Sequence, residues 1–319
     1  MPVSTRRSDL PPVDSVKALW RRYELPNWVV AIAIYGAWAI LFGNARHLPW
    51  YVLSPVGAYI LAWHFSLQHE AIHGWLSAPK WLRTALVWPP IGGWLPFEIY
   101  RKSHSQHHRD VNITVPAADT ETVYHRKEDW DRYSKAWRAV LMFNQTLLGR
   151  LLIGPILRLR KLVIVETGLL RAGDCRNVGV WLRFFVGLAA ILWFVSSVGG
   201  MPVWQYYLLI VYPSMSIGLL RAFIEHRWGD TPDERIAAVE TNRLFGMLFL
   251  WNNLHIVHHV HPSMAWYDIP GYYRANRAKL LAMNGSYMFP GYLHIARRWF
   301  WRPVFVPVHP GTSDQGVVS

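Results

Sequence analysis

The longest charge-free segment is the feature of this sequence that most restricts its fold. Residues 184–220 contain no Asp, Glu, Lys or Arg. As a single helix the segment would be about 55 Å long, whereas the hydrocarbon core of a bilayer is only about 30 Å thick. The Gly-Gly-Met-Pro sequence at 199–202 favours a turn near its middle. We therefore expect two membrane spans, over 181–198 and 204–222, that form a hairpin.

A second pair of apolar segments lies nearer the N-terminus. Residues 26–45 carry no formal charge, and after Arg46 the next charge-free segment runs from 47 to 69. Each segment is long enough to cross a bilayer as a helix. We expect spans over approximately 28–45 and 50–68, which would form another hairpin.

The distribution of basic residues predicts the orientation of these spans. Of 33 Lys and Arg residues, only Arg46 lies in a short loop within a predicted hairpin. By the positive-inside rule, both termini and the long middle region should face the cytoplasm. The sequence thus predicts an all-α, multi-pass integral membrane protein with four transmembrane helices in two hairpins. We expect one domain over 1–319, with a cytosolic helical cap formed by 69–180 and 223–300.

The composition is also compatible with a soluble helical protein or a nucleic-acid-binding protein. A mean hydropathy of +0.10 is modest for an integral membrane protein and is compatible with a soluble helical protein that has a large core. The segment 184–220 argues against this class, because a helix there has no polar face to show to water. The net charge of +13 could indicate a nucleic-acid-binding protein, but no recognisable binding module accompanies it. We interpret the charge as a surface that faces anionic lipid, and we predict no nucleic-acid partner.

Histidine is the expected metal ligand in this chain. The single cysteine, Cys175, excludes an internal disulfide framework and any zinc or iron–sulfur site that needs several thiolates. The chain has 15 histidines. His69 and His73 are four residues apart, so a helix would place both on one face. This pair alone would be weak evidence for a metal site.

Two further clusters strengthen the prediction of a metal site. The pattern His-x-x-His-His occurs at 104–108 and again at 255–259, and it places three imidazoles on one stripe of a helix. His226 follows the last predicted span directly. An ionisable side chain at the edge of a membrane span usually has a function, so His226 is a further candidate ligand. The candidate ligands are His69, His73, His104, His107, His108, His226, His255, His258 and His259.

The number of candidate ligands predicts two metal ions, because one octahedral ion cannot use them all. Imidazole binds iron, copper, zinc and nickel, but zinc and copper sites usually need fewer histidines. A pair of irons that activates dioxygen therefore explains the set best. A membrane protein that stores or transports metal is an alternative, although the predicted spans lack the acidic or thiol ligands that such a protein would use. Five polar residues beside the clusters are candidates to hold the second ring nitrogen of a ligand: Glu70, Glu98, Asp110, Asn252 and Asn253.

The clusters also resemble a known family. The sequences HEAIH, HSQHH and NNLHIVHH occur in this order, with a predicted hairpin between the second and third, and they resemble the three histidine boxes of the membrane fatty acid desaturase superfamily. The sequence EHR after the last predicted span resembles the additional histidine of that superfamily. The resemblance implies a non-haem di-iron enzyme that uses O2 to desaturate or hydroxylate an acyl chain at an unactivated C–H bond.

Departures from the family pattern narrow the expected function. Front-end desaturases carry Gln where this chain has His255, which argues against that branch. HEAIHG and HHVHP are also similar to boxes of carotenoid ketolases and hydroxylases, so that activity is the second hypothesis. The tail contains His309-Pro310-Gly311 but no surrounding cytochrome b5 domain. The resemblance therefore implies a separate electron donor, such as a ferredoxin with its reductase.

Overall fold

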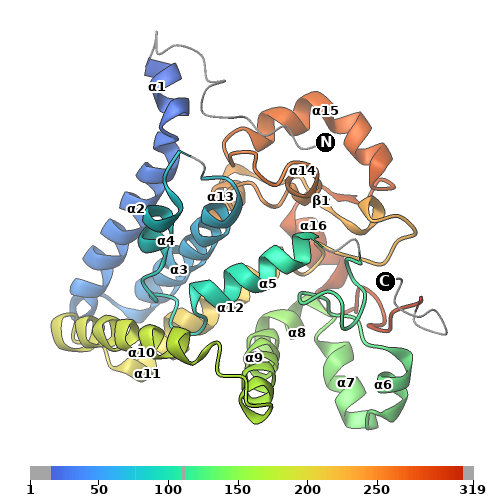
Figure 1. Ribbon diagram of the computed structural model, residues 1–319, viewed down its shortest axis with the longest axis horizontal. Coiled ribbons are helices and arrows are strands. Elements are labelled where there is room, and N and C mark those ends of the chain that lie inside the picture. Colours follow the sequence, from blue (N-terminus) through green and yellow to red (C-terminus); the bar gives the residue numbers. More distant parts are fainter. Residues whose placement is uncertain (1–15, 76, 110–111, 312–319) are drawn as a thin grey trace.

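The protein is largely helical (Figure 1). The structure is a computed structural model that describes residues 16–75, 77–109 and 112–311. The N-terminal half contains α1 (Val16–Arg22), α2 (Leu25–Gly43), the 3₁₀ turn η2 (Ala45–His47), α3 (Trp50–His73), α4 (Lys80–Val87), α5 (Phe97–Arg109), α6 (Lys127–Arg132), α7 (Lys135–Phe143), α8 (Leu147–Leu152) and α9 (Gly154–Arg171).

The C-terminal half runs from α10 to α16. Its elements are α10 (Val178–Trp193), the π-helical turn η3 (Phe194–Val198), α11 (Val203–Gln205), the π-helical turn η4 (Tyr206–Val211), α12 (Tyr212–Arg221), η5 (Asp233–Arg235), β1 (Ala238–Val239), α13 (Arg243–Leu248), α14 (His255–Val260), α15 (Ile269–Met283), β2 (Met288–Phe289) and α16 (Tyr292–Trp299). The two short strands pair in parallel.

Three segments of the described chain are long and apolar enough to cross a membrane: Leu25–Gly43, Val178–Val198 and Val203–Arg221. They coincide with the first, third and fourth predicted spans. The second predicted span falls within α3, a helix that continues past its apolar part into the polar sequence around His69. The span in α3, the pairing of the spans into two hairpins, the side of the membrane and the cytosolic cap therefore stay predictions.

The turn after α2 packs directly against the turn at 199–200. The backbone N–H of Arg46 donates to the carbonyl of Gly199 at 2.9 Å. A Cβ atom on Gly199 would lie 1.9 Å from the carbonyl oxygen of Phe42, so only glycine allows this approach. The next residue, Gly200, has φ +69, in the left-handed region that favours glycine. The Gly-Gly sequence thus makes one turn and allows it to contact the other.

We expect Gly199→Ala to destabilise the protein by about 1–3 kcal/mol, because the added methyl group must displace backbone. The measurement is the thermal unfolding midpoint of the purified protein in detergent. Gly36→Ala in α2 is the matched control, since no atom lies within 4 Å of its Cβ position. Equal midpoints for the two variants would contradict the close packing of the turns.

The third histidine box is anchored to the small parallel sheet. The Asn253 side chain donates to the carbonyl of Val239 in β1 at 2.7 Å, and the Val239 N–H donates to the Asn253 carbonyl at 2.8 Å. Just before this anchor, Leu250 and Trp251 adopt φ values of 46 and 57. Residues other than glycine adopt this conformation at a cost, which the surrounding packing must offset. This turn leads directly into α14, whose histidines lie close to those of the other two boxes.

Candidate metal centre

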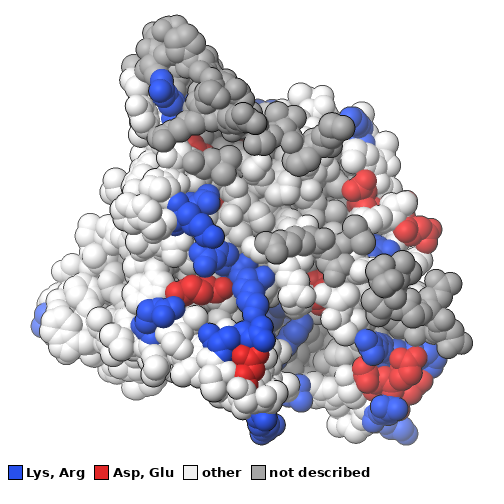
Figure 2. All heavy atoms as spheres, in the orientation of Figure 1, with Lys and Arg blue, Asp and Glu red and all other residues white. Residues whose placement is uncertain are grey.

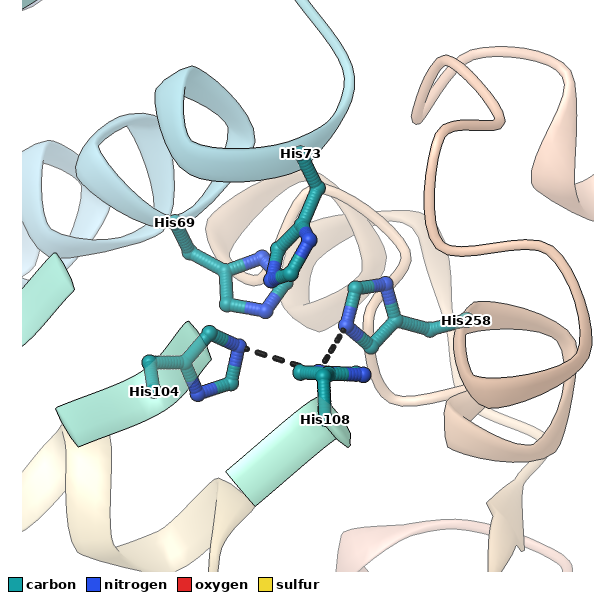
Figure 3. A group of neighbouring side chains, drawn as sticks. All are labelled: His69, His73, His104, His108 and His258. Carbon is teal, nitrogen blue, oxygen red and sulfur yellow. Dashed lines mark hydrogen bonds between the residues drawn. The ribbon is translucent and has the colours of Figure 1, made fainter. Parts of the chain in front are cut away.

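Four parts of the chain bring the nine predicted histidines together. The end of α3 carries His69 and His73, α5 carries the second box, α14 carries the third, and His226 follows α12. The histidines form two groups, and within each group one ring nitrogen of every member lies within 4.8 Å of those of the others. The first histidine group contains His69, His73, His104, His108 and His258 (Figure 3). The second histidine group contains His107, His226, His255 and His259.

The second and third boxes each supply both groups. In α5, His104 and His108 join the first histidine group whereas His107 joins the second. In α14, His258 joins the first group, whereas His255 and His259 join the second. Two metal sites built in this way must be adjacent, because the same two helices form both.

The inner ring nitrogens converge closely within each group. In the first group, His108 Nε2 lies 3.1 Å from His104 Nε2 and 2.8 Å from His258 Nε2. In the second group, His255 Nε2 lies 3.1 Å from the Nε2 atoms of both His226 and His259. Neutral imidazole Nε2 atoms that meet at a common point are the arrangement that a metal ion requires.

Two buried nitrogens support the fit of a metal to this site. His73 Nε2 in the first group and His107 Nε2 in the second are buried, and neither has a hydrogen-bond partner among the described residues. A buried nitrogen without a partner costs free energy that coordination of a metal would recover. Since each group has one such atom, the donor set fits one metal ion per group.

Carboxylates hold the outer nitrogens of two α5 histidines. His107 Nδ1 donates to Asp119 Oδ1 at 2.8 Å, and His104 Nδ1 donates to Glu121 Oε1 at 2.9 Å. Such partners fix the orientation of a metal-binding ring and leave Nε2 free for the metal. The backbone N–H of Thr114 donates to Asp119 Oδ2 at 2.9 Å, which holds this carboxylate in place.

The buried charges around the second group influence one another. Burial acts to lower the pKa of His107, but the hydrogen bond to Asp119 and the charge of Glu121 raise it to about 9. Burial lowers the pKa of His226 to about 3, helped by the charge of His107. Burial also lowers the pKa of His255 and of His259 well below the usual range, so both rings are neutral and able to bind metal.

The other residues proposed to support the ligands occupy different positions. Asn252 lies between the two groups, with Nδ2 3.3 Å from His69 Nε2 and Oδ1 3.2 Å from His255 Nδ1. Asn253 contacts the sheet, as described above. Glu70 accepts a hydrogen bond from the backbone N–H of Trp266 at 3.4 Å. Glu98 Oε1 lies 3.6 Å from Arg183 Nη2, and Asp110 lies outside the described residues.

A cavity of about 420 Å³ is lined by Gln68, Ser103 and Glu121, which are neighbours of first-group histidines, although none of the nine histidines lines it directly. Its apolar wall comes from α3, α12 and the segment before α5, and includes Leu61, Trp94 and Met215. It reaches Glu121, the carboxylate that accepts from His104. This volume lies within the range of pockets that hold small ligands.

Comparison of the sequence with known protein families agrees with the arrangement of the histidines. The sequence model of the fatty acid desaturase family matches residues 47–292, which include all nine histidines. The chain belongs to the fatty acid desaturase family. This finding confirms the resemblance that the three boxes indicate. No curated protein matches this desaturase-family chain in a sequence search.

Asp119 and Glu121 are the residues of this desaturase-family site that sequence reasoning missed. Both lie in the loop after α5, in the sequence Ala-Ala-Asp-Thr-Glu-Thr, about ten residues beyond the second box. No helical spacing connects them to the histidines, so only their acidic character close to a box could have indicated them.

We expect Asp119→Ala to weaken metal binding roughly 10- to 100-fold, as is typical when a residue that orients a metal ligand is lost. The measurement is metal retention against a chelator of known affinity. Asp131→Ala is the control, because that carboxylate is exposed and pairs only with Lys127 on the surface. Retention equal to that of the unmodified protein would show that Asp119 does not support the metal.

Proposed function

We propose that this chain is a multi-pass membrane oxidoreductase in which two irons and O2 desaturate or hydroxylate an acyl chain at an unactivated C–H bond. The observation that carries the proposal is the pair of adjacent histidine groups in a chain of the fatty acid desaturase family. Each group would hold one iron, and all nine histidines would be ligands. Membership in this family supports a lipid substrate and an association with the membrane.

The bound irons would supply the activation of O2, which no amino-acid side chain can provide. The protein would supply orientation and a water-poor site. Asp119 and Glu121 would hold the rings of His107 and His104, and Asn252 would link the two groups. The cavity beside the first group would hold the acyl chain. Five of the nine histidines are buried and the other four are half-buried, which would keep bulk water from the reacting carbon.

Oxygen chemistry of this kind also needs an electron source. Desaturation leaves two waters from one O2, so two electrons must come from a donor in addition to the hydrogens of the substrate. We propose a separate donor, a ferredoxin or a similar protein with its reductase. We further propose that α3 is the fourth membrane span and that the metal centre and both termini face the cytoplasm, as the distribution of basic residues predicts.

The test is lipid mass spectrometry of a host that produces the protein, with iron measured on the purified protein. Desaturation predicts a lipid two mass units lighter than its precursor, and hydroxylation predicts one sixteen units heavier. His258→Ala should abolish the product. If the protein holds iron but host lipids do not change, a host that makes carotenoids tests the second hypothesis. Absence of iron from the purified protein would overturn the proposal.

A further inference from the structure

Four basic side chains line the cavity beside the metal centre, of which Arg221 pairs with Glu225 and the other three form no salt bridge in the described part of the chain. Lys102 comes from α5, and Arg158 and Lys161 come from α9. Lys102 and Lys161 are exposed and Arg158 is half-buried, so this part of the cavity meets the surface. Figure 2 shows that Lys and Arg side chains form a band over α4 and α5 on this side of the molecule.

Lys102, Arg158 and Lys161 form no salt bridge among the described residues, although Arg158 and Lys161 lie near enough to Glu121 to interact with its charge. No carboxylate oxygen lies within 4.0 Å of any of them in the described part of the chain. Lys161 Nζ donates to the carbonyl of Thr120 at 2.7 Å, which leaves two of its three N–H groups available. Arg158 and Lys161 are three residues apart on α9, so their like charges face each other and repel. An anion between them would remove this cost.

The carboxylates that line the same cavity are already engaged. Glu121 accepts from His104, and Glu225 pairs with Arg221 at 3.0 Å. Glu166 accepts from Asn177 and Trp181, which ties α9 to α10. Four cationic side chains and three carboxylates line the cavity, so the net charge of its lining is +1 and an external anion is the complementary ligand.

The remainder of the cavity suits an apolar chain. Leu61, Met215 and Leu219 are apolar side chains in its wall. Gly218 also lines it, and no atom lies within 4 Å of the position that a Cβ would take there. The wall at Gly218 is thus open. A cavity with a cationic mouth and an apolar interior matches an amphiphile that has an anionic head.

We propose that Lys102, Arg158 and Lys161 form a binding site for the anionic head group of the substrate, a carboxylate or a phosphate, and that the acyl chain lies along the wall at Gly218. This inference rests on the proposed function, because it identifies the cavity as the substrate site. An uncharged polyene such as a carotene would gain no binding energy from these three cations, so the site favours an acyl lipid as the substrate.

The test is equilibrium binding of three radiolabelled probes to the full-length, metal-loaded protein in neutral detergent. The probes are stearate, 1-stearoyl-lysophosphatidate and stearyl alcohol, which share a chain and differ in the head. We expect Arg158→Gln/Lys161→Gln to raise the Kd of the anionic probe about tenfold or more and to leave stearyl alcohol unchanged. Arg171→Gln is the matched control, because it removes the same charge from the same helix outside the cavity.

The possible outcomes test the head-group site independently of the proposed oxidoreductase function. Loss of stearate binding identifies a carboxylate head, and loss of lysophosphatidate binding alone identifies a phosphate head. Unchanged binding of both anions overturns the inference, as does an equal loss of stearyl alcohol. Arg158→Lys, which keeps the charge, should bind as the unmodified protein does and so guards against misfolding. If the protein binds the anion by charge but oxidises no lipid, the proposed function fails and the site stands.

Discussion

The variant His107→Ala is expected to retain about half of the metal and to lose activity by a factor of roughly a thousand or more, because both irons are needed to activate O2. His107 belongs to the second histidine group only, and its unpartnered Nε2 is the atom expected to bind metal. His73→Ala should give the same result through the first group. The measurements are iron per protein and turnover of the lipid identified by mass spectrometry.

The control for both variants is His261→Ala. His261 follows the third box, but its Nε2 lies 2.7 Å from the hydroxyl of Tyr272 and it belongs to neither histidine group. Iron content and turnover of this variant should match those of the unmodified protein. If His107→Ala keeps both irons, the division of the nine histidines into two sites is wrong.

Arg221→Met is expected to destabilise the protein by about 3–5 kcal/mol, because it leaves the carboxylate of Glu225 buried without its ion partner. Arg221 Nε lies 3.0 Å from Glu225 Oε1, and their side chains are only 11% and 7% exposed. Glu225 Oε1 also lies 3.7 Å from His255 Nδ1, so the variant should disturb the second histidine group as well. The measurement is the free energy of unfolding in detergent.

The double variant Arg221→Met/Glu225→Gln distinguishes a lost ion pair from a packing defect. It removes both charges and keeps side chains of similar volume, so a large part of the lost stability should return. If the single and double variants are equally unstable, the loss comes from packing around Arg221 and the account given above is incorrect.

Much of the fold could be predicted from the distribution of charge. Long uncharged segments identify α2, the α10 segment and the α12 segment, since a helix without a polar face is expected in lipid. The helix α3 is harder to classify, because the same helix must be apolar in its first part and carry His69 and His73 at its end. The Gly-Gly turn was predictable, whereas its contact with the first hairpin depends on tertiary packing.

The histidines could be predicted because their chemistry is distinctive and their spacing is local to one helix. Their division into two groups could not, since it depends on how α3, α5 and α14 cross in space. Asp119 and Glu121 were not predictable for the same reason: a loop brings them to the histidines. For Glu98, which also lies close in sequence to a box, the structure gives a pairing with Arg183.

The sharing of α5 and α14 between the two groups has a consequence for the distance between the groups. Neighbouring histidines on one helix belong to different groups, so the helical repeat sets how far apart the groups lie. Backbone hydrogen bonds within a helix resist stretching. We therefore expect the spacing of the two groups along α5 and α14 to be the same in the metal-free and the metal-loaded protein.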